Sequence, residues 1–108
     1  MKKVVLAVLL LAVALFLILP SLSWAQTTEL YKAKCAACHG ADGKGTAAGQ
    51  KMGAQAFSSP AVQKMSDSEL ADFILNGGPQ KKASHAFGSK GVSADDAAKL
   101  AAFVKTLK

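Results

Sequence analysis

Hydrophobic residues form one long continuous run near the start of this chain and several shorter, spaced patterns after it. The run from Val4 to Leu19 is sixteen residues of almost unbroken Val, Leu, Ala, Ile and Phe. In 66–76 and 93–107, apolar residues instead recur every three or four positions, which places them on one face of a helix. No stretch alternates apolar and polar residues over the length of a strand. The pattern therefore predicts an all-α fold.

The first hydrophobic run has the features of a secretory signal peptide. Lys2 and Lys3 precede it, Pro20 interrupts it, and Ser23-Trp24-Ala25 supplies small residues at the positions that a signal peptidase recognises. We therefore predict a signal peptide over 1–25, cleavage after Ala25, and an exported or periplasmic protein. The alternative is an uncleaved membrane anchor, although sixteen apolar residues are fewer than the about 20 that span a bilayer.

Cleavage would leave a single small domain, residues 26–108, with 83 residues. This domain carries 11 Lys against 7 acidic residues and no Arg. Dispersed lysines without Arg do not form a nucleic-acid-binding stripe, whereas a mildly basic surface suits an acidic face on a protein partner. Domains this small often need a metal, a cofactor or a disulfide for stability, so we expect a poorly ordered apoprotein.

The predicted domain begins with a helix that ends in a glycine-rich loop. Thr27 or Thr28 can cap a helix that runs to Cys38. Gly40 to Gly45 contains three glycines in six residues, which predicts a tight loop. The stretch 46–57 is only weakly patterned. Two of its apolar residues are expected to turn inward: Met52 and Phe57.

Three further helices follow from capping and terminating residues. Ser59-Pro60 can start a short helix that continues through Met65. Ser66 to Glu69 forms a capping-box pattern for the next helix, which Asn76-Gly77-Gly78-Pro79 ends. Gln80 to Val92 is predicted to be a loop. Ser93 to Asp96 then opens the last helix.

The most specific motif is Cys35-Ala36-Ala37-Cys38-His39, which contains the only two cysteines of the chain. C-x-x-C-H is the pattern of covalent haem attachment. Thiols three residues apart on a helical turn share one face, so both can reach the vinyl groups of one porphyrin, and His39 can serve as an axial ligand of the iron. A thioredoxin-type pair would need a βαβ pattern, and a zinc site would lack ligands. We therefore predict one covalent haem c.

With this motif in place, the chain resembles small bacterial class I cytochromes c over residues 27–108. The resemblance rests on four segments: the attachment motif, the HG-x-DGKG run from His39 to Gly45, the SDSEL start of the central helix, and the last helix ending at 102–107. It implies about three to five helices wrapped around one haem c, with one edge exposed for electron transfer. It also implies that Tyr31 packs near Phe103 where the first and last helices cross.

The chain departs from that family in the loop that normally supplies the second axial ligand. Family members usually carry a Met there, but Lys81 to Gly88 contains none. Ser84 falls in the place of that Met, and His85, the only other histidine, is next to it. We therefore hypothesise bis-histidine coordination by His39 and His85, the alternative being that His85 is a solvated loop residue. Two methionines are rival ligands, Met65 and then Met52, and an open or water-bound iron is a further alternative.

A second departure concerns the side of the iron that His39 binds. Relatives commonly have a Pro about a dozen residues after the attachment His, whose carbonyl accepts a hydrogen bond from the imidazole Nδ1. This sequence has no Pro between Gly40 and Ser59. We expect a backbone carbonyl in 46–52 to take that role, because the partner of the ring N–H orients a ligating histidine.

These features predict a monomeric electron carrier rather than an enzyme. The iron would cycle between Fe(III) and Fe(II), and the partners would be redox proteins with acidic docking faces. A second imidazole in place of a thioether lowers the reduction potential. The alternative function is a haem with an open sixth site that senses a small ligand or reacts with peroxide.

Overall fold

The structure is a computed structural model that describes the backbone of residues 1–107 and the side chains of 1–13 and 23–107. Part of the predicted signal segment, including the side chain of Pro20, therefore lies outside the described side chains. Within the described range the elements in chain order are α1 (Lys2–Lys34), α2 (Ala36–His39), α3 (Ala47–Lys51), α4 (Pro60–Gln63), α5 (Asp67–Asn76), the 3-10 turns η1 (Ala83–His85) and η2 (Phe87–Lys90), and α6 (Ala94–Val104). Residues 1–107 contain no strand, and the predicted all-α class is confirmed. Residues 1–107 form six α-helices, α1 to α6, where three to five were expected. Three of them, α2, α3 and α4, are short.

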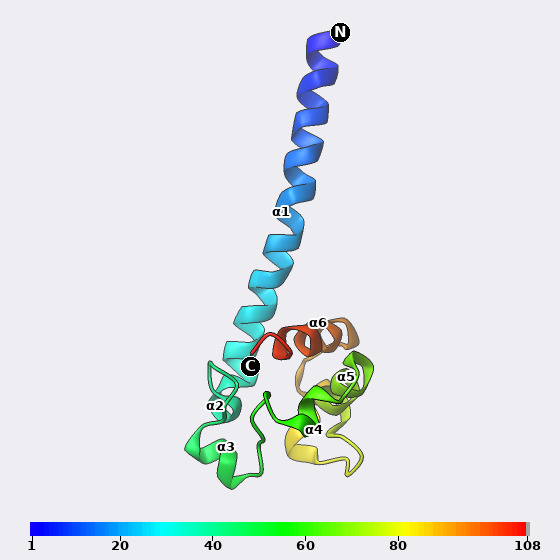
Figure 1. Ribbon diagram of the computed structural model, residues 1–108. Helices are drawn as coiled ribbons and strands as arrows, with labels where there is room; N and C mark the ends of the chain where they lie inside the picture. Colours follow the sequence, from blue (N-terminus) through cyan, green and yellow to red (C-terminus); the bar gives the residue numbers. More distant parts are fainter. Residues whose placement is uncertain (108) are drawn as a thin grey trace.

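Helix α1 is much longer than the other helices and projects away from the rest of the molecule (Figure 1). The molecule measures 65 × 25 × 24 Å along its principal axes, and the long dimension follows this helix. Side chains from Val4 to Val13 on its outer part are exposed. Among residues 1–13 and 23–107, no helix is long and apolar enough to cross a membrane.

The start of this helix corrects the sequence-based prediction. Neither Thr27 nor Thr28 caps a helix, because α1 begins at Lys2 and continues through position 20. The Thr27 hydroxyl donates to the carbonyl of Ser23 and the Thr28 hydroxyl to the carbonyl of Trp24, both at 3.0 Å. Threonines inside a helix commonly bond the carbonyl four residues back. In the full chain the helix continues into Thr27 and Thr28 from the residues before them, so neither threonine is needed as a cap.

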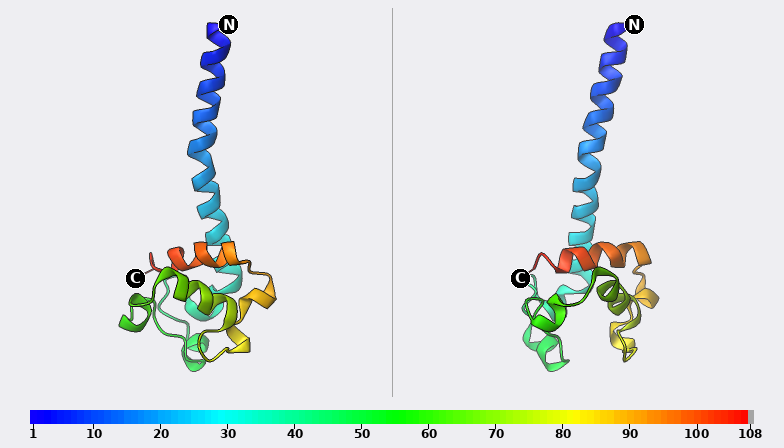
Figure 2. Two further views of the ribbon diagram at one scale, coloured as in Figure 1. Left: turned by 90° about the vertical axis from the view of Figure 1, so that its right-hand side faces the viewer. Right: turned by 45° about the vertical axis from the view of Figure 1, so that its right-hand side comes forward.

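The core forms where the end of α1 crosses α6, and α5 packs against α6 from below (Figure 2). Tyr31 from α1 meets Phe103 from α6 with ring centroids 5.1 Å apart, as the family resemblance implied. The Tyr31 hydroxyl donates to the carbonyl of Gly40 at 2.6 Å, and burial raises its pKa to about 12. The remaining core residues are Phe57, Val92, Ala97, Leu100 and Val104. Each large apolar side chain buried here contributes about 1.5–3 kcal/mol.

Two capping boxes fix the starts of α5 and α6. The sequence predicted the first as a capping box and the second only as the start of a helix. The Ser66 hydroxyl accepts from the Glu69 N–H at 3.1 Å, and the Glu69 carboxylate accepts from the Ser66 N–H at 3.3 Å. Ser93 and Asp96 repeat the arrangement at the start of α6. At its other end α5 stops at Gly77, whose φ of +83° is in the left-handed region that glycine tolerates.

The stretch 46–57 contains helix α3, which the weak pattern did not predict. The Thr46 hydroxyl accepts from the Gly49 N–H at 3.1 Å and donates to the carbonyl of Ala37 at 2.8 Å, so it joins α3 to α2. Phe57 is buried as expected. Met52 is 63 % exposed, contrary to prediction, because it occupies the C-terminal cap of this short helix at the mouth of a cavity.

Gly49 is the closest point of approach between α3 and α2. A Cβ at this buried position would overlap the backbone carbonyl of Cys38. We expect Gly49→Ala to lower the free energy of unfolding of the holoprotein by about 1–3 kcal/mol, the usual cost of overpacking. Urea unfolding followed by far-ultraviolet circular dichroism measures this change. Lys51→Ala on the exposed side of α3 is the control and should stay within about 0.5 kcal/mol of the parent; equal stability of the two variants would contradict the prediction.

Candidate haem-binding site

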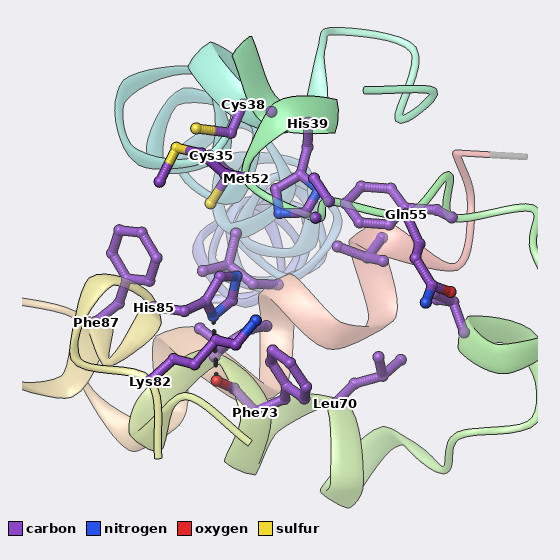
Figure 3. A pocket seen from close by; sticks show the side chains of 18 of the residues that line it. Cys35, Cys38, His39, Met52, Gln55, Leu70, Phe73, Lys82, His85 and Phe87 are labelled. Atoms are coloured by element: carbon purple, nitrogen blue, oxygen red, sulfur yellow. Dashed lines mark hydrogen bonds between the residues drawn. The ribbon is translucent and has the colours of Figure 1, made fainter. Parts of the chain in front are cut away.

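A cavity of about 360 Å³ separates two walls of the domain (Figure 3). One wall is formed by the end of α1 with α2 and α3, and the other by α5, η1 and η2. All the candidate residues from the sequence line this cavity: Cys35, Cys38, His39, Met52, Met65 and His85. Much of the remaining lining is apolar and includes Leu70, Ile74 and Val104. The volume lies in the range of small-molecule and cofactor sites.

A break in the helix at Cys35 positions the attachment motif. Cys35 has φ −120° and ψ −38°, so α1 ends there and α2 begins with the next residue, whereas the sequence predicted one helix through Cys38. The break remains hydrogen-bonded, because the Cys35 N–H donates to the Tyr31 carbonyl at 2.8 Å and the His39 N–H donates to the Cys35 carbonyl at 2.9 Å. Both cysteines thus stay on the cavity wall, with His39 at the end of the same short turn.

The two cysteines are free, half-buried thiols. Burial, with a smaller effect of neighbouring Cys38, raises the pKa of Cys35 to about 11. A reactive thiol of the thioredoxin type has a pKa lowered toward neutrality instead. The environment of Cys35 therefore disfavours a thiol-exchange role and suits a thiol that faces an apolar group.

His39 points into the cavity from the same wall. Its ring stacks on Phe57 with centroids 4.7 Å apart and planes 26° from parallel. Burial, with a contribution from nearby His85, lowers the pKa of His39. The imidazole is therefore neutral, which is the form that binds a metal.

The expected partner of the His39 ring N–H is not found. His39 Nδ1 is buried and has no hydrogen-bond partner among the described residues, so the predicted carbonyl in 46–52 does not take this role. Several carbonyls of that stretch bond within α3 and its cap instead. The Thr46 carbonyl accepts from Gln50, and the Gly49 carbonyl accepts from Met52 and Ala54.

His85 faces His39 from the opposite wall, with ring centroids 5.9 Å apart and planes at 87° (Figure 3). Its ring lies between the edges of Phe73 and Phe87, at centroid distances of 5.1 and 5.2 Å. His85 Nδ1 lies 3.2 Å from the carbonyl oxygen of Phe73. Because a carbonyl can only accept, Nδ1 carries the proton and Nε2 keeps its lone pair free for a metal.

The separation of the two imidazoles fits a single metal ion between them. A metal–imidazole nitrogen bond is about 2 Å long and the ring centroid lies about 1 Å behind the nitrogen, so two rings across one metal are about 6 Å apart. The 5.9 Å between His39 and His85 matches this value. Cys35 and Cys38 lie on the same wall as His39, where a porphyrin held by that histidine would meet both thiols.

The two rival ligands line the same cavity at other positions. Met52 lies beside Cys35 and His39, on the wall that carries the motif, rather than opposite it (Figure 3). Met65 is half-buried at the turn between α4 and α5. The ring of His85 faces His39 across the cavity, with centroids 5.9 Å apart.

Comparison with known proteins identifies the chain. The family described as "Cytochrome C oxidase, cbb3-type, subunit III" matches residues 23–104. The chain belongs to this cytochrome c family. Its structure is similar to that of the KustC0563 c-type cytochrome, with 29% sequence identity and a TM-score of 0.64 over 75% of this chain and 95% of that one. A search of curated proteins finds no match.

Membership in the cytochrome c family implies a covalent haem c and haem-based electron transfer. Proteins of this family are typically electron carriers rather than enzymes and are generally exported. In this cytochrome the chemistry of the site agrees, because it offers two free thiols, a neutral buried imidazole and apolar walls in one cavity. The buried, unpartnered His39 Nδ1 is the one polar atom in the site that the described residues leave unsatisfied.

Sequence reasoning did not foresee two contacts in this cytochrome. The carbonyl of Phe73 holds His85, and the ring of Phe57 stacks on His39. The signal for the first was weak but present, since Phe73 lies four residues before the glycine that ends α5, where helix carbonyls lose their intrahelical partners.

Proposed function

We propose that this cytochrome is a periplasmic, monomeric one-electron carrier whose haem iron is bound by His39 and His85. The observation that supports this ligation best is the pair of imidazoles that face each other at 5.9 Å across an apolar cavity. Cys35 and Cys38 would bind the haem through thioethers. The haem supplies a one-electron Fe(III)/Fe(II) couple when bound.

The residues around the proposed ligands favour fast and reversible electron transfer. Phe57 stacks on His39, while Phe73 and Phe87 flank His85. These contacts hold both rings in place, and apolar walls limit the access of water to them. A second imidazole stabilises Fe(III) relative to a thioether, so the protein would have a lower potential than methionine-ligated relatives.

Visible and near-infrared absorption spectra of the holoprotein in both redox states test this ligation. We expect six-coordinate, low-spin haem in each state, no sulfur-to-iron band, and no reaction of the ferrous protein with carbon monoxide. A sulfur-to-iron band would instead assign the ligand to Met65 or Met52. Carbon monoxide binding would favour the open-site alternative, a small-ligand sensor or a peroxide-reactive enzyme.

We propose that the N-terminal segment is removed after export. Trp24 packs on Phe103 with ring centroids 5.4 Å apart in the full chain, and cleavage after Ala25 would remove this contact. We expect N-terminal sequencing of the holoprotein from the periplasmic fraction to begin at Gln26. Ala25→Phe, which places a bulky side chain at the cleavage position, should accumulate the uncleaved chain. A wild-type holoprotein that begins at Met1 and sediments with membranes would contradict the proposal and support a retained anchor.

We further propose that the redox partners present acidic faces to the mouth of the cavity. Lys34 and Lys82 line the cavity. Lys90 lies beside Lys34 and Ser84, since its carbonyl accepts from the Lys34 ammonium and its own ammonium donates to the Ser84 carbonyl. Charges of this kind speed the encounter of two proteins. The rate of electron exchange with an acidic redox protein should therefore fall as ionic strength rises; a rate independent of salt would contradict this proposal.

A further inference from the structure

We propose that the C-terminal end of helix α5, through the backbone carbonyl of Phe73, orients His85 and strengthens it as a ligand. Phe73 is thus a positioning residue. This inference rests on the ligation of iron by His85 proposed above.

Phe73 contacts the His85 ring in two ways. Its carbonyl oxygen accepts from Nδ1 at 3.2 Å, which fixes the tautomer and the direction in which Nε2 points (Figure 3). Its aromatic ring also meets the imidazole edge-on at 5.1 Å, with planes at 81°. The hydrogen bond and the ring contact together restrict rotation of His85 about its side-chain bonds.

The position of this carbonyl in α5 explains why it can act on the imidazole. The last four carbonyls of a helix lack intrahelical partners and carry the negative end of the helix dipole. α5 has ten residues and stops at Gly77, whose N–H donates one hydrogen bond to the Phe73 carbonyl at 2.9 Å. The second lone pair of that oxygen remains available to His85. An N–H bonded to such a carbonyl makes the imidazole a stronger donor to the metal.

The two proposed axial ligands differ in this respect. His85 has a hydrogen-bonded Nδ1, whereas His39 Nδ1 has no partner within the described part of the chain. His39 is instead held by its stacking on Phe57 and by its place at the end of the attachment motif. The protein environment would therefore tune the potential through His85 rather than through His39.

Backbone contacts in the turn after α5 hold the ring against Phe73. The Lys82 N–H donates to the carbonyl of Gly77 at 3.2 Å, and the His85 N–H donates to the carbonyl of Lys82 at 2.9 Å. Gly77 has φ +83°, and a Cβ added there would overlap the Lys82 carbonyl. Gly77→Ala should therefore push Lys82, and with it η1, away from the end of α5.

Gly91→Ala is the matched control for Gly77→Ala. Gly91 also has a positive φ, +93°, but a Cβ there meets no described atom within 4 Å. Both substitutions thus strain a left-handed residue, while only Gly77→Ala displaces the segment that carries His85. A purely structural effect of the strain would appear in both variants.

The test combines redox titration of the two holoprotein variants with ¹⁵N-histidine NMR of the diamagnetic ferrous state. Losing the hydrogen bond makes His85 a weaker donor to Fe(III). We therefore expect Gly77→Ala to shift the reduction equilibrium about tenfold toward Fe(II), which is a rise of about 59 mV, with no such shift in Gly91→Ala. The Nδ1–H of His85 should be protected from solvent exchange in the wild type and in Gly91→Ala, and at least tenfold less protected in Gly77→Ala. Carbon monoxide binding by Gly77→Ala alone would also support the positioning role.

Two results would overturn the inference in distinguishable ways. If His85 Nε2 shows iron ligation but its Nδ1–H exchanges freely in the wild type, the role of Phe73 is wrong and the ligation stands. If both glycine variants keep the wild-type potential and protection, the role of Phe73 is likewise wrong. If Nε2 of His85 shows no iron ligation at all, the proposed ligation fails and this inference fails with it.

Discussion

Replacing Cys35 and Cys38 together with serine is expected to abolish covalent haem retention. No other thiol in the chain could replace them, and both line the cavity. The loss should also unfold the domain to a large degree. Without the haem, the apolar walls of the cavity lose the group that they would pack against, and the whole stability of a typical domain is only about 5–15 kcal/mol.

Haem staining of a denaturing gel and far-ultraviolet circular dichroism measure these two effects. Each single Cys→Ser variant keeps one thiol and should retain some haem. Ala37→Ser is the control, because this exposed residue lies between the cysteines and the substitution adds a hydroxyl without removing a thiol. A double variant that stains for haem would show that the motif does not attach the cofactor. A double variant that stays fully helical without haem would contradict the expected unfolding.

Replacing His85 with alanine is expected to open the sixth position of the iron. The variant should bind carbon monoxide in the ferrous state and become at least partly high-spin in the ferric state, because the ring that faces His39 at 5.9 Å is gone. His85→Met should restore a six-coordinate haem and raise the potential by on the order of a hundred millivolts, within the about 0.8 V that axial ligands cover.

Met65→Leu is the matched control for these variants. It removes the rival sulfur but keeps an apolar side chain of similar volume in the cavity wall. The absorption spectrum and the reduction potential of Met65→Leu should equal those of the wild type. The opposite pattern, in which His85→Ala stays low-spin and Met65→Leu binds carbon monoxide, would transfer the ligand role to Met65.

Local features of this protein could be predicted from the sequence because their causes are local. The capping box at Ser66 and the helix start at Ser93 need only residues three positions apart, and the C-x-x-C-H motif needs only one helical turn. The contact of Tyr31 with Phe103 came from the family resemblance, which carries long-range information that periodicity does not. His85 was found as a candidate because it stands next to the position of the family methionine.

The remaining features depend on backbone and long-range contacts, which the types of the side chains do not reveal. The orienting group of His85 is a backbone carbonyl, which every residue has, so the only signal for Phe73 was its place four residues before the glycine that ends α5. Thr46 bonds to α2 and so joins α3 to it, and several carbonyls expected to serve His39 bond within α3. The start of α1 was predicted at Thr27 or Thr28, but both lie inside the helix. A threonine that caps a helix and one inside a helix cannot be told apart from the residue type alone.

An iron bound by both facing histidines would restrict the conformations of the unfolded chain. His39 and His85 are 46 positions apart, so an iron bound by both would close a loop of that length in the same way as a disulfide. Loop closure of this size removes entropy from the unfolded chain worth about 4 kcal/mol. The iron would then act as a reversible cross-link between the two halves of the domain, and release of His85 alone would return much of the conformational freedom of the unfolded chain.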